Sequence, residues 1–74
     1  MNEMGQGVQG DLPTTIGKPA TRALHGAGYT HLAQLTTATT RDLLKLHGFG
    51  PKAIRLLREA LAEDGQTFAD ERPQ

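Results

Sequence analysis

The sequence predicts an all-α domain, and three features support this prediction. Apolar residues recur at the i, i+3, i+4 and i+7 positions of a helix. Glycine and proline stand between these segments, where helices begin and end. No segment alternates polar and apolar residues as a half-buried strand would. A chain of 74 residues allows one small domain with a modest core.

The first helix is expected over residues 18–27. Its small apolar residues fall on one stripe, which allows a close approach to a neighbouring helix; they are Ala20, Ala23, Leu24 and Ala27. Gly28 is suited to end this helix in a left-handed conformation. Leu12 and Ile16 precede it and are expected to lie against the core.

Two short helices are expected next. Thr30 can cap a helix over residues 31–35, with Tyr29, Leu32 and Leu35 facing inward. The threonine-rich residues 36–40 disfavour a continuous helix. Thr39, with Asp42 three residues later, resembles a capping box and predicts a third helix over residues 40–46.

A tight hairpin is expected at residues 46–53, Leu-His-Gly-Phe-Gly-Pro-Lys-Ala. Gly48 is suited to the left-handed cap that ends the third helix. Phe49 is interpreted as an apolar plug between the helices. Pro51 suits the first turn of the fourth helix, where its missing N–H group costs nothing.

The fourth and longest helix is expected over residues 51–64, with Gly65 at its end. Phe68 is expected to return and cover the core. The sequence therefore predicts a disordered leader over residues 1–11, a helical domain over residues 12–69 and a disordered tail over residues 70–74.

Charge is distributed unevenly along a chain whose net charge is zero. Residues 17–58 contain seven basic residues and one acidic residue, a net charge of +6, whereas residues 1–16 carry −2 and residues 59–74 carry −4. A basic centre favours a polyanionic partner. The alternative is that these charges only keep the surface soluble.

The starts of the first and fourth helices offer a chemical site. Gly50 leaves bare backbone at the positive end of a helix, close to Lys52, and such a helix start can receive a phosphate. The segment Ile-Gly-Lys-Pro-Ala at residues 16–20 is an approximate repeat of this pattern. The candidate nucleic-acid-binding residues are therefore Gly17, Lys18, Arg22, His47, Gly48, Gly50, Lys52 and Arg55.

The second hairpin resembles a helix-hairpin-helix motif, with Gly-apolar-Gly followed by Pro-Lys-Ala. Residues 12–68 further resemble the C-terminal domain of the bacterial RNA polymerase alpha subunit. The shared order is an apolar lead-in and helix, a Gly-aromatic step, a short Leu-x-x-Leu helix, a threonine-rich stretch, Leu-Leu-Lys, the hairpin and a long helix.

This resemblance implies a compact four- to five-helix bundle of the SAM-like type, with one clear and one degenerate helix-hairpin-helix motif. It also implies non-enzymatic contact with DNA, in which the first helix start and the hairpin touch the backbone at the minor groove. By position, Gly50 and Lys52 match the family's hairpin contacts. Lys18-Pro19 replaces the family's key arginine, Arg22 its asparagine, and Ala53 a small hydroxyl residue. We therefore expect salt-sensitive, largely sequence-neutral DNA binding, and a cytoplasmic, nucleoid-associated protein acting in transcription.

The sequence gives less support to metal binding, to catalysis and to other classes of function. His25, His31 and His47 lie at unrelated spacings and no cysteine is present, so no metal site and no cofactor are expected. The acids that follow residue 58 suggest no catalytic pocket, and no enzyme is expected. The alternative function is a protein-interaction module for a transcription or repair protein, in which the hairpin is only structural. A further hypothesis is that the acidic segment 64–71 competes for the basic face.

Overall fold

The computed structural model describes residues 11–72, and this part of the chain is helical without strands. Its three α-helices are α1 (Lys18–Gly26), α2 (Thr40–Leu44) and α3 (Pro51–Glu63). Its three 3₁₀ helices are η2 (Thr14–Ile16), η3 (Leu32–Thr37) and η4 (Ala69–Glu71). The predicted all-α class is confirmed.

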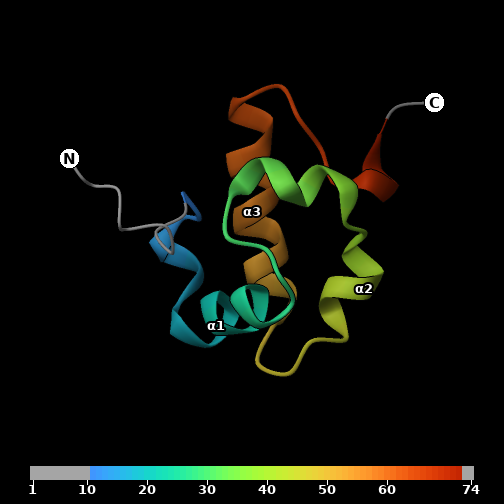
Figure 1. Cartoon of the computed structure of the whole chain (residues 1–74). Coiled ribbons are helices and arrows are strands. Elements are labelled where there is room, and N and C mark those ends of the chain that lie inside the picture. The colour runs from blue at the N-terminus through green and yellow to red at the C-terminus, as the bar shows by residue number, and fades with distance from the viewer. Residues whose placement is uncertain (1–10, 73–74) are drawn as a thin grey trace.

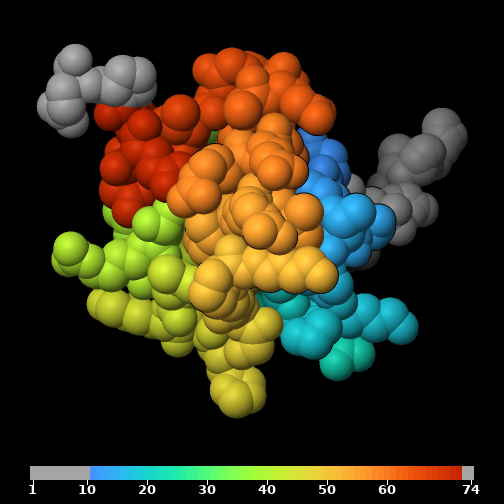
Figure 2. Space-filling model, turned by 180° about the vertical axis from the view of Figure 1, so that it is seen from behind, coloured from blue at the N-terminus to red at the C-terminus, as the bar shows by residue number. Residues whose placement is uncertain are grey.

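Helix α3 is the central element of the fold (Figure 1). Helices α1 and α2 lie on opposite sides of it, and η3 crosses one of its faces (Figure 1). The other face of α3 is open to solvent and runs between the N-terminal and C-terminal parts of the domain (Figure 2). The fold therefore leaves one long side of α3 available for contacts.

The core draws four buried side chains from α3, two each from α1 and η3, and one from α2. Six side chains are fully buried: Leu24, Leu35, Leu43, Leu57, Leu61 and Phe68. Phe49 is 7% exposed and lies in the same cluster, so the predicted apolar plug is confirmed. Leu12 and Ile16 are half-buried against this cluster, as expected.

The two long helices have nearly the predicted bounds, but the second helix differs in type and in its cap. It is the 3₁₀ helix η3, and Thr30 is not its cap. The Gln34 side chain instead accepts hydrogen bonds from the N–H groups of Thr30 and His31, at 2.7 and 2.8 Å. The Thr30 hydroxyl contacts the His31 ring, so it is not available to cap η3.

Helix α2 is shorter than predicted, because the chain leaves the helix after Leu44 and turns through Lys45 and Leu46. Its predicted cap is present, since the Thr39 hydroxyl accepts a hydrogen bond from the N–H group of Asp42 at 3.1 Å. Of the threonine-rich residues 36–40, only Ala38 and Thr39 lie between η3 and α2, so the predicted break is present but shorter than expected.

The two ends of the described chain are held more firmly than the sequence indicates. The Asp11 carboxylate accepts a hydrogen bond from the N–H group of Leu32, which ties the expected leader to η3. Asp70, Glu71 and Arg72 were expected in the tail, yet each contacts the domain through its side chain. The rest of the expected leader and tail, residues 1–10 and 73–74, lies outside the described residues.

Within residues 11–72, no helix combines the length and apolar character that crossing a membrane requires.

Candidate nucleic-acid interface

The starts of α1 and α3 are built alike. Gly17 and Gly50 are their N-cap residues, and neither helix has a side-chain cap. Each first turn contains a proline and an exposed lysine, Lys18 in α1 and Lys52 in α3. The third position of each helix is a buried alanine, Ala20 or Ala53. The two helix starts are therefore similar in composition, but they differ in conformation, since Gly17 has a φ of +91° and Gly50 a φ of −135°.

These glycine caps leave the positive ends of the two helices without a negative group from the chain. The N–H groups of a first helical turn have no acceptor inside the helix. Serine, threonine, aspartate or asparagine at the cap would supply one, but glycine cannot. Neither α1 nor α3 has an acidic residue in its first turn. Both helix starts can therefore accept an external anion.

Thr21 fixes the start of α1. Its backbone N–H and its hydroxyl both donate to the carbonyl oxygen of Gly17, at 3.0 and 2.9 Å. Gly17 has a φ of +91°, a conformation that favours glycine. The chain can thus turn sharply from η2 into α1.

The hairpin lies directly against the first turn of α1. A Cβ atom placed on Gly48 would come within 3.4 Å of the carbonyl oxygen of Pro19 and 3.5 Å of its Cβ atom. Gly48 also has a φ of +86°, which agrees with the predicted left-handed cap. The connection between α2 and α3 runs beside α1 (Figure 1). This contact brings together two segments that lie about thirty residues apart in the sequence.

Two open pockets flank the first turn of α1. One has a volume of about 350 Å³ and lies between α1 and the hairpin; it is lined by Pro19, Arg22, Ala23, His47 and Gly48. The other has a volume of about 450 Å³ and is lined by Thr14, Gly17, Lys18, Thr21 and Arg22. Arg22 lines both pockets, so its guanidinium group can serve an anion on either side of the helix.

The structure brings five of the eight candidate residues into these pockets: Gly17, Lys18, Arg22, His47 and Gly48. Gly50, Lys52 and Arg55 line neither pocket. Lys52 and Arg55 are exposed on α3, whereas Gly50 is half-buried at its start. The candidate residues therefore form two adjoining parts, one around α1 and one at the start of α3.

Four of the candidate cations form no ion pair in the described structure. Ion pairs among residues 11–72 are formed by Lys45 with Asp42, at 3.8 Å, and by Arg58 with Glu71, at 2.6 Å. None involves Lys18, Arg22, Lys52 or Arg55. Their charge is thus directed to solvent, where a polyanion could reach it.

The charges of α3 run against its helix dipole. Lys52 stands at the positive end of the helix, and Glu59, Glu63 and Asp64 stand at the negative end. The opposite order would stabilise the helix, by about 0.3–1 kcal/mol for each well-placed charge. A local rule broken in this way is typical of a functional site.

Three further residues shape this surface and were not among the candidates. Pro19 is the residue of α1 that Gly48 packs against. The Thr21 hydroxyl holds Gly17 in place through its hydrogen bond to the Gly17 carbonyl oxygen. The spacing of four residues between Gly17 and Thr21, which allows this hydrogen bond in a helix, is visible in the sequence. Arg58 extends the cations of α3, and hydrogen bonding to Glu71 raises the pKa of its guanidinium group.

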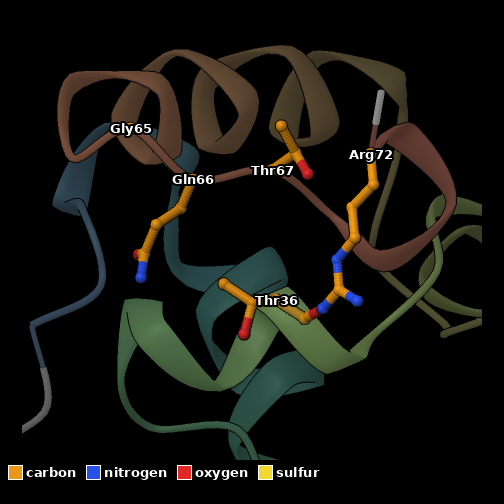
Figure 3. Close-up of a pocket in the computed structure, with 5 residues that line it drawn as sticks. All are labelled: Thr36, Gly65, Gln66, Thr67 and Arg72. Atoms are coloured by element: carbon orange, nitrogen blue, oxygen red, sulfur yellow. The ribbon is translucent and has the colours of Figure 1, made fainter. Parts of the chain in front are cut away.

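A third pocket lies at the far end of α3, away from the hairpin. Its volume is about 440 Å³, and it is lined by Thr36, Gly65, Gln66, Thr67 and Arg72 (Figure 3). Arg72 reaches across it and donates a hydrogen bond to the carbonyl oxygen of Thr36 at 3.0 Å (Figure 3). The pocket is thus partly closed by a structural contact.

Among residues 11–72, no group of three or more histidine, aspartate or glutamate side chains is placed to hold a metal ion.

Comparison with protein-family models, curated proteins and solved structures finds no match to this chain.

Proposed function

We propose that this chain is a small DNA-binding module that contacts the sugar-phosphate backbone through the paired starts of α1 and α3. The contact of Gly48 with Pro19 carries this proposal, because it brings the hairpin to the first turn of α1. Helix N-termini and lysine side chains both bind phosphate oxygens. Two adjacent helix starts, each with a lysine, are better suited to bind the repeated phosphates of a nucleic acid than a single small anion.

Electrostatics supports the same proposal. Both helices carry a lysine in the first turn, where an acidic residue would stabilise the helix. An unfavourable charge in the first turn of both helices is explained by an anionic partner that neutralises both lysines. In this proposal the acidic end of α3 points away from the duplex.

The proposed architecture is a SAM-like bundle with two helix-hairpin-helix turns, as in the polymerase alpha C-terminal domain that the sequence resembles. The proposed binding is largely independent of DNA sequence, because phosphate contacts position a protein without reading bases. No row of asparagine, glutamine and arginine side chains is available to read base edges. The module would act without catalysis, in the nucleoid.

The test is a titration of a labelled random-sequence duplex at several salt concentrations. The logarithm of the binding constant should fall linearly with the logarithm of salt concentration. Lys52→Ala should reduce the slope by about 0.9, the value for one lost phosphate contact. Lys45→Ala is the matched control, because Lys45 is also exposed but pairs with Asp42 on α2. Equal slopes for the wild type and Lys52→Ala would refute the proposed contact.

The second candidate function is a protein-interaction module, and the exposure of Leu44 favours it. Leu44 is the large apolar side chain of the described residues that remains most exposed, at 44%. Binding through α2 would depend on Leu44 and change little with salt. Loss of binding to a captured partner in Leu44→Ala, without any DNA binding at low salt, would favour this function.

A further inference from the structure

Three cations follow one another along the exposed side of α3. Lys52, Arg55 and Arg58 are spaced three residues apart, and all three are exposed. The first and last are separated by about 9 Å along the helix axis, from a rise of 1.5 Å per residue. This cation row starts at the hairpin, within the proposed interface, and continues toward the C-terminal segment.

Arg58, the last cation of the row, forms an ion pair with the Glu71 carboxylate. Arg58 Nε lies 3.0 Å and 3.1 Å from the two carboxylate oxygens of Glu71, and Nη2 lies 2.6 Å from Oε2. The carboxylate thus takes one edge of the guanidinium group in a forked arrangement. Lys52 and Arg55, at the other positions of the row, form no ion pair within residues 11–72.

Glu71 is held in place by its neighbours in the chain. The Phe68 side chain is fully buried, which anchors the start of η4 in the core. Asp70 accepts hydrogen bonds from the N–H and hydroxyl groups of Thr40, and Arg72 donates to Thr36 (Figure 3). The C-terminal segment accordingly borders the exposed side of α3 (Figure 2). Glu71 is therefore presented to Arg58 by a fixed segment.

We infer that Glu71 competes with a DNA phosphate for Arg58 and so weakens the DNA contact. This inference rests on the proposed function and deepens it. In the free domain the available row ends at Arg55. When DNA lies along α3, a phosphate replaces the carboxylate and Arg58 becomes the third contact of the row.

The chemistry of the guanidinium group permits this exchange. Its planar set of N–H donors binds a carboxylate or a phosphate in the same forked geometry. The Arg58 side chain is 49% exposed, so a phosphate can approach without unfolding the helix. An exposed ion pair is also weak in water, which makes it replaceable by a polyanion.

The test compares duplex affinity at one low salt concentration in a set of matched variants. Glu71→Gln removes the competing charge, so duplex binding should tighten by about 1.5- to 5-fold, the cost of breaking an exposed ion pair. Glu59→Gln is the control, because it makes the same charge change beside Arg58 at an exposed residue that forms no ion pair within residues 11–72. In an Arg58→Ala background, Glu71→Gln should change the duplex affinity no more than Glu59→Gln does.

A direct readout follows the Arg58 Nε–H resonance in the wild type during titration with the duplex. It should shift as the duplex is added, and the shift should reverse with added salt. An unmoved resonance, an unchanged duplex affinity in Glu71→Gln, or an equal change in Glu59→Gln would overturn the inference. If Lys52→Ala still reduces the slope in that case, the proposed function stands and only the role of Glu71 fails. If the wild type binds no duplex at low salt, the proposed function fails as well.

Discussion

Gly48 is the residue on which the two-part interface depends. Its φ of +86° strains any residue that carries a side chain, and a Cβ atom there would touch Pro19 at ordinary van der Waals distance. Gly48→Ala should lower the free energy of unfolding by about 1–2 kcal/mol, the cost of a left-handed conformation for an L-residue. Urea denaturation measures this change.

Gly26 provides the control for this substitution. A Cβ atom there would meet nothing within 4 Å, and its φ is not positive. Gly26→Ala should leave stability unchanged or raise it by up to about 1 kcal/mol, because alanine favours a helix over glycine. A Gly48→Ala variant as stable as the wild type would contradict the left-handed conformation of Gly48.

Asp70 makes the attachment of the C-terminal segment sensitive to acid. Hydrogen bonds from the hydroxyl and backbone N–H groups of Thr40 lower the pKa of Asp70 below its ordinary value of 3.8. A lowered carboxyl pKa gives stability that is present above the unfolded-state value and is lost as the pH falls through the folded-state value. The segment should therefore loosen only below about pH 4.

The measurement for Asp70 is the pH dependence of the Thr40 amide resonance. Its midpoint should lie below 3.8, the ordinary aspartate value. Asp70→Asn should abolish this transition, since the asparagine side chain does not titrate. A midpoint above 3.8 would show that the Thr40 hydrogen bonds do not favour the charged carboxylate.

At the scale of elements, α3 has an apolar stripe that packs into the core, but the order of its charged residues is unfavourable to its helix dipole. We predict that Lys52→Glu stabilises the isolated domain by about 0.3–1 kcal/mol, because an acidic residue in the first turn favours the helix dipole. The same substitution should abolish duplex binding. Thermal unfolding and the duplex titration together measure these opposite effects, and lower stability in Lys52→Glu would show that Lys52 has a structural role.

The short elements show where reasoning from sequence stops. Leu32 and Leu35 were placed correctly in the core, because their spacing fits one face of a helix. That spacing also fits a 3₁₀ turn, so it could not distinguish the two helix types. In the structure, the Gln34 side chain turns back to the N–H groups of Thr30 and His31 at the start of the 3₁₀ helix.

At the scale of the whole molecule, Phe68 makes the C-terminal segment part of the fold. Its side chain is fully buried, and Phe68→Ala should cost about 3–5 kcal/mol. A chain of this size has a total stability of roughly 4–11 kcal/mol, so this variant should be largely destabilised. Urea denaturation should show the loss, whereas Leu44→Ala should change stability by less than about 0.5 kcal/mol because Leu44 is exposed.

The sequence by itself determined the all-α class, the extents of α1 and α3, and the inward positions of Phe49 and Phe68. These follow from local rules, because apolar spacing, glycine and proline act within a few residues of the chain.

Only the tertiary structure decided the contact of Gly48 with Pro19 and the pairing of Glu71 with Arg58. Both join segments that are distant in the sequence, so their geometry depends on how α1, α3 and η4 lie around one core. Helix propensity, capping and apolar spacing act over a few residues, so they carry no information on contacts between distant segments. The arrangement of the proposed interface therefore had to come from the folded chain.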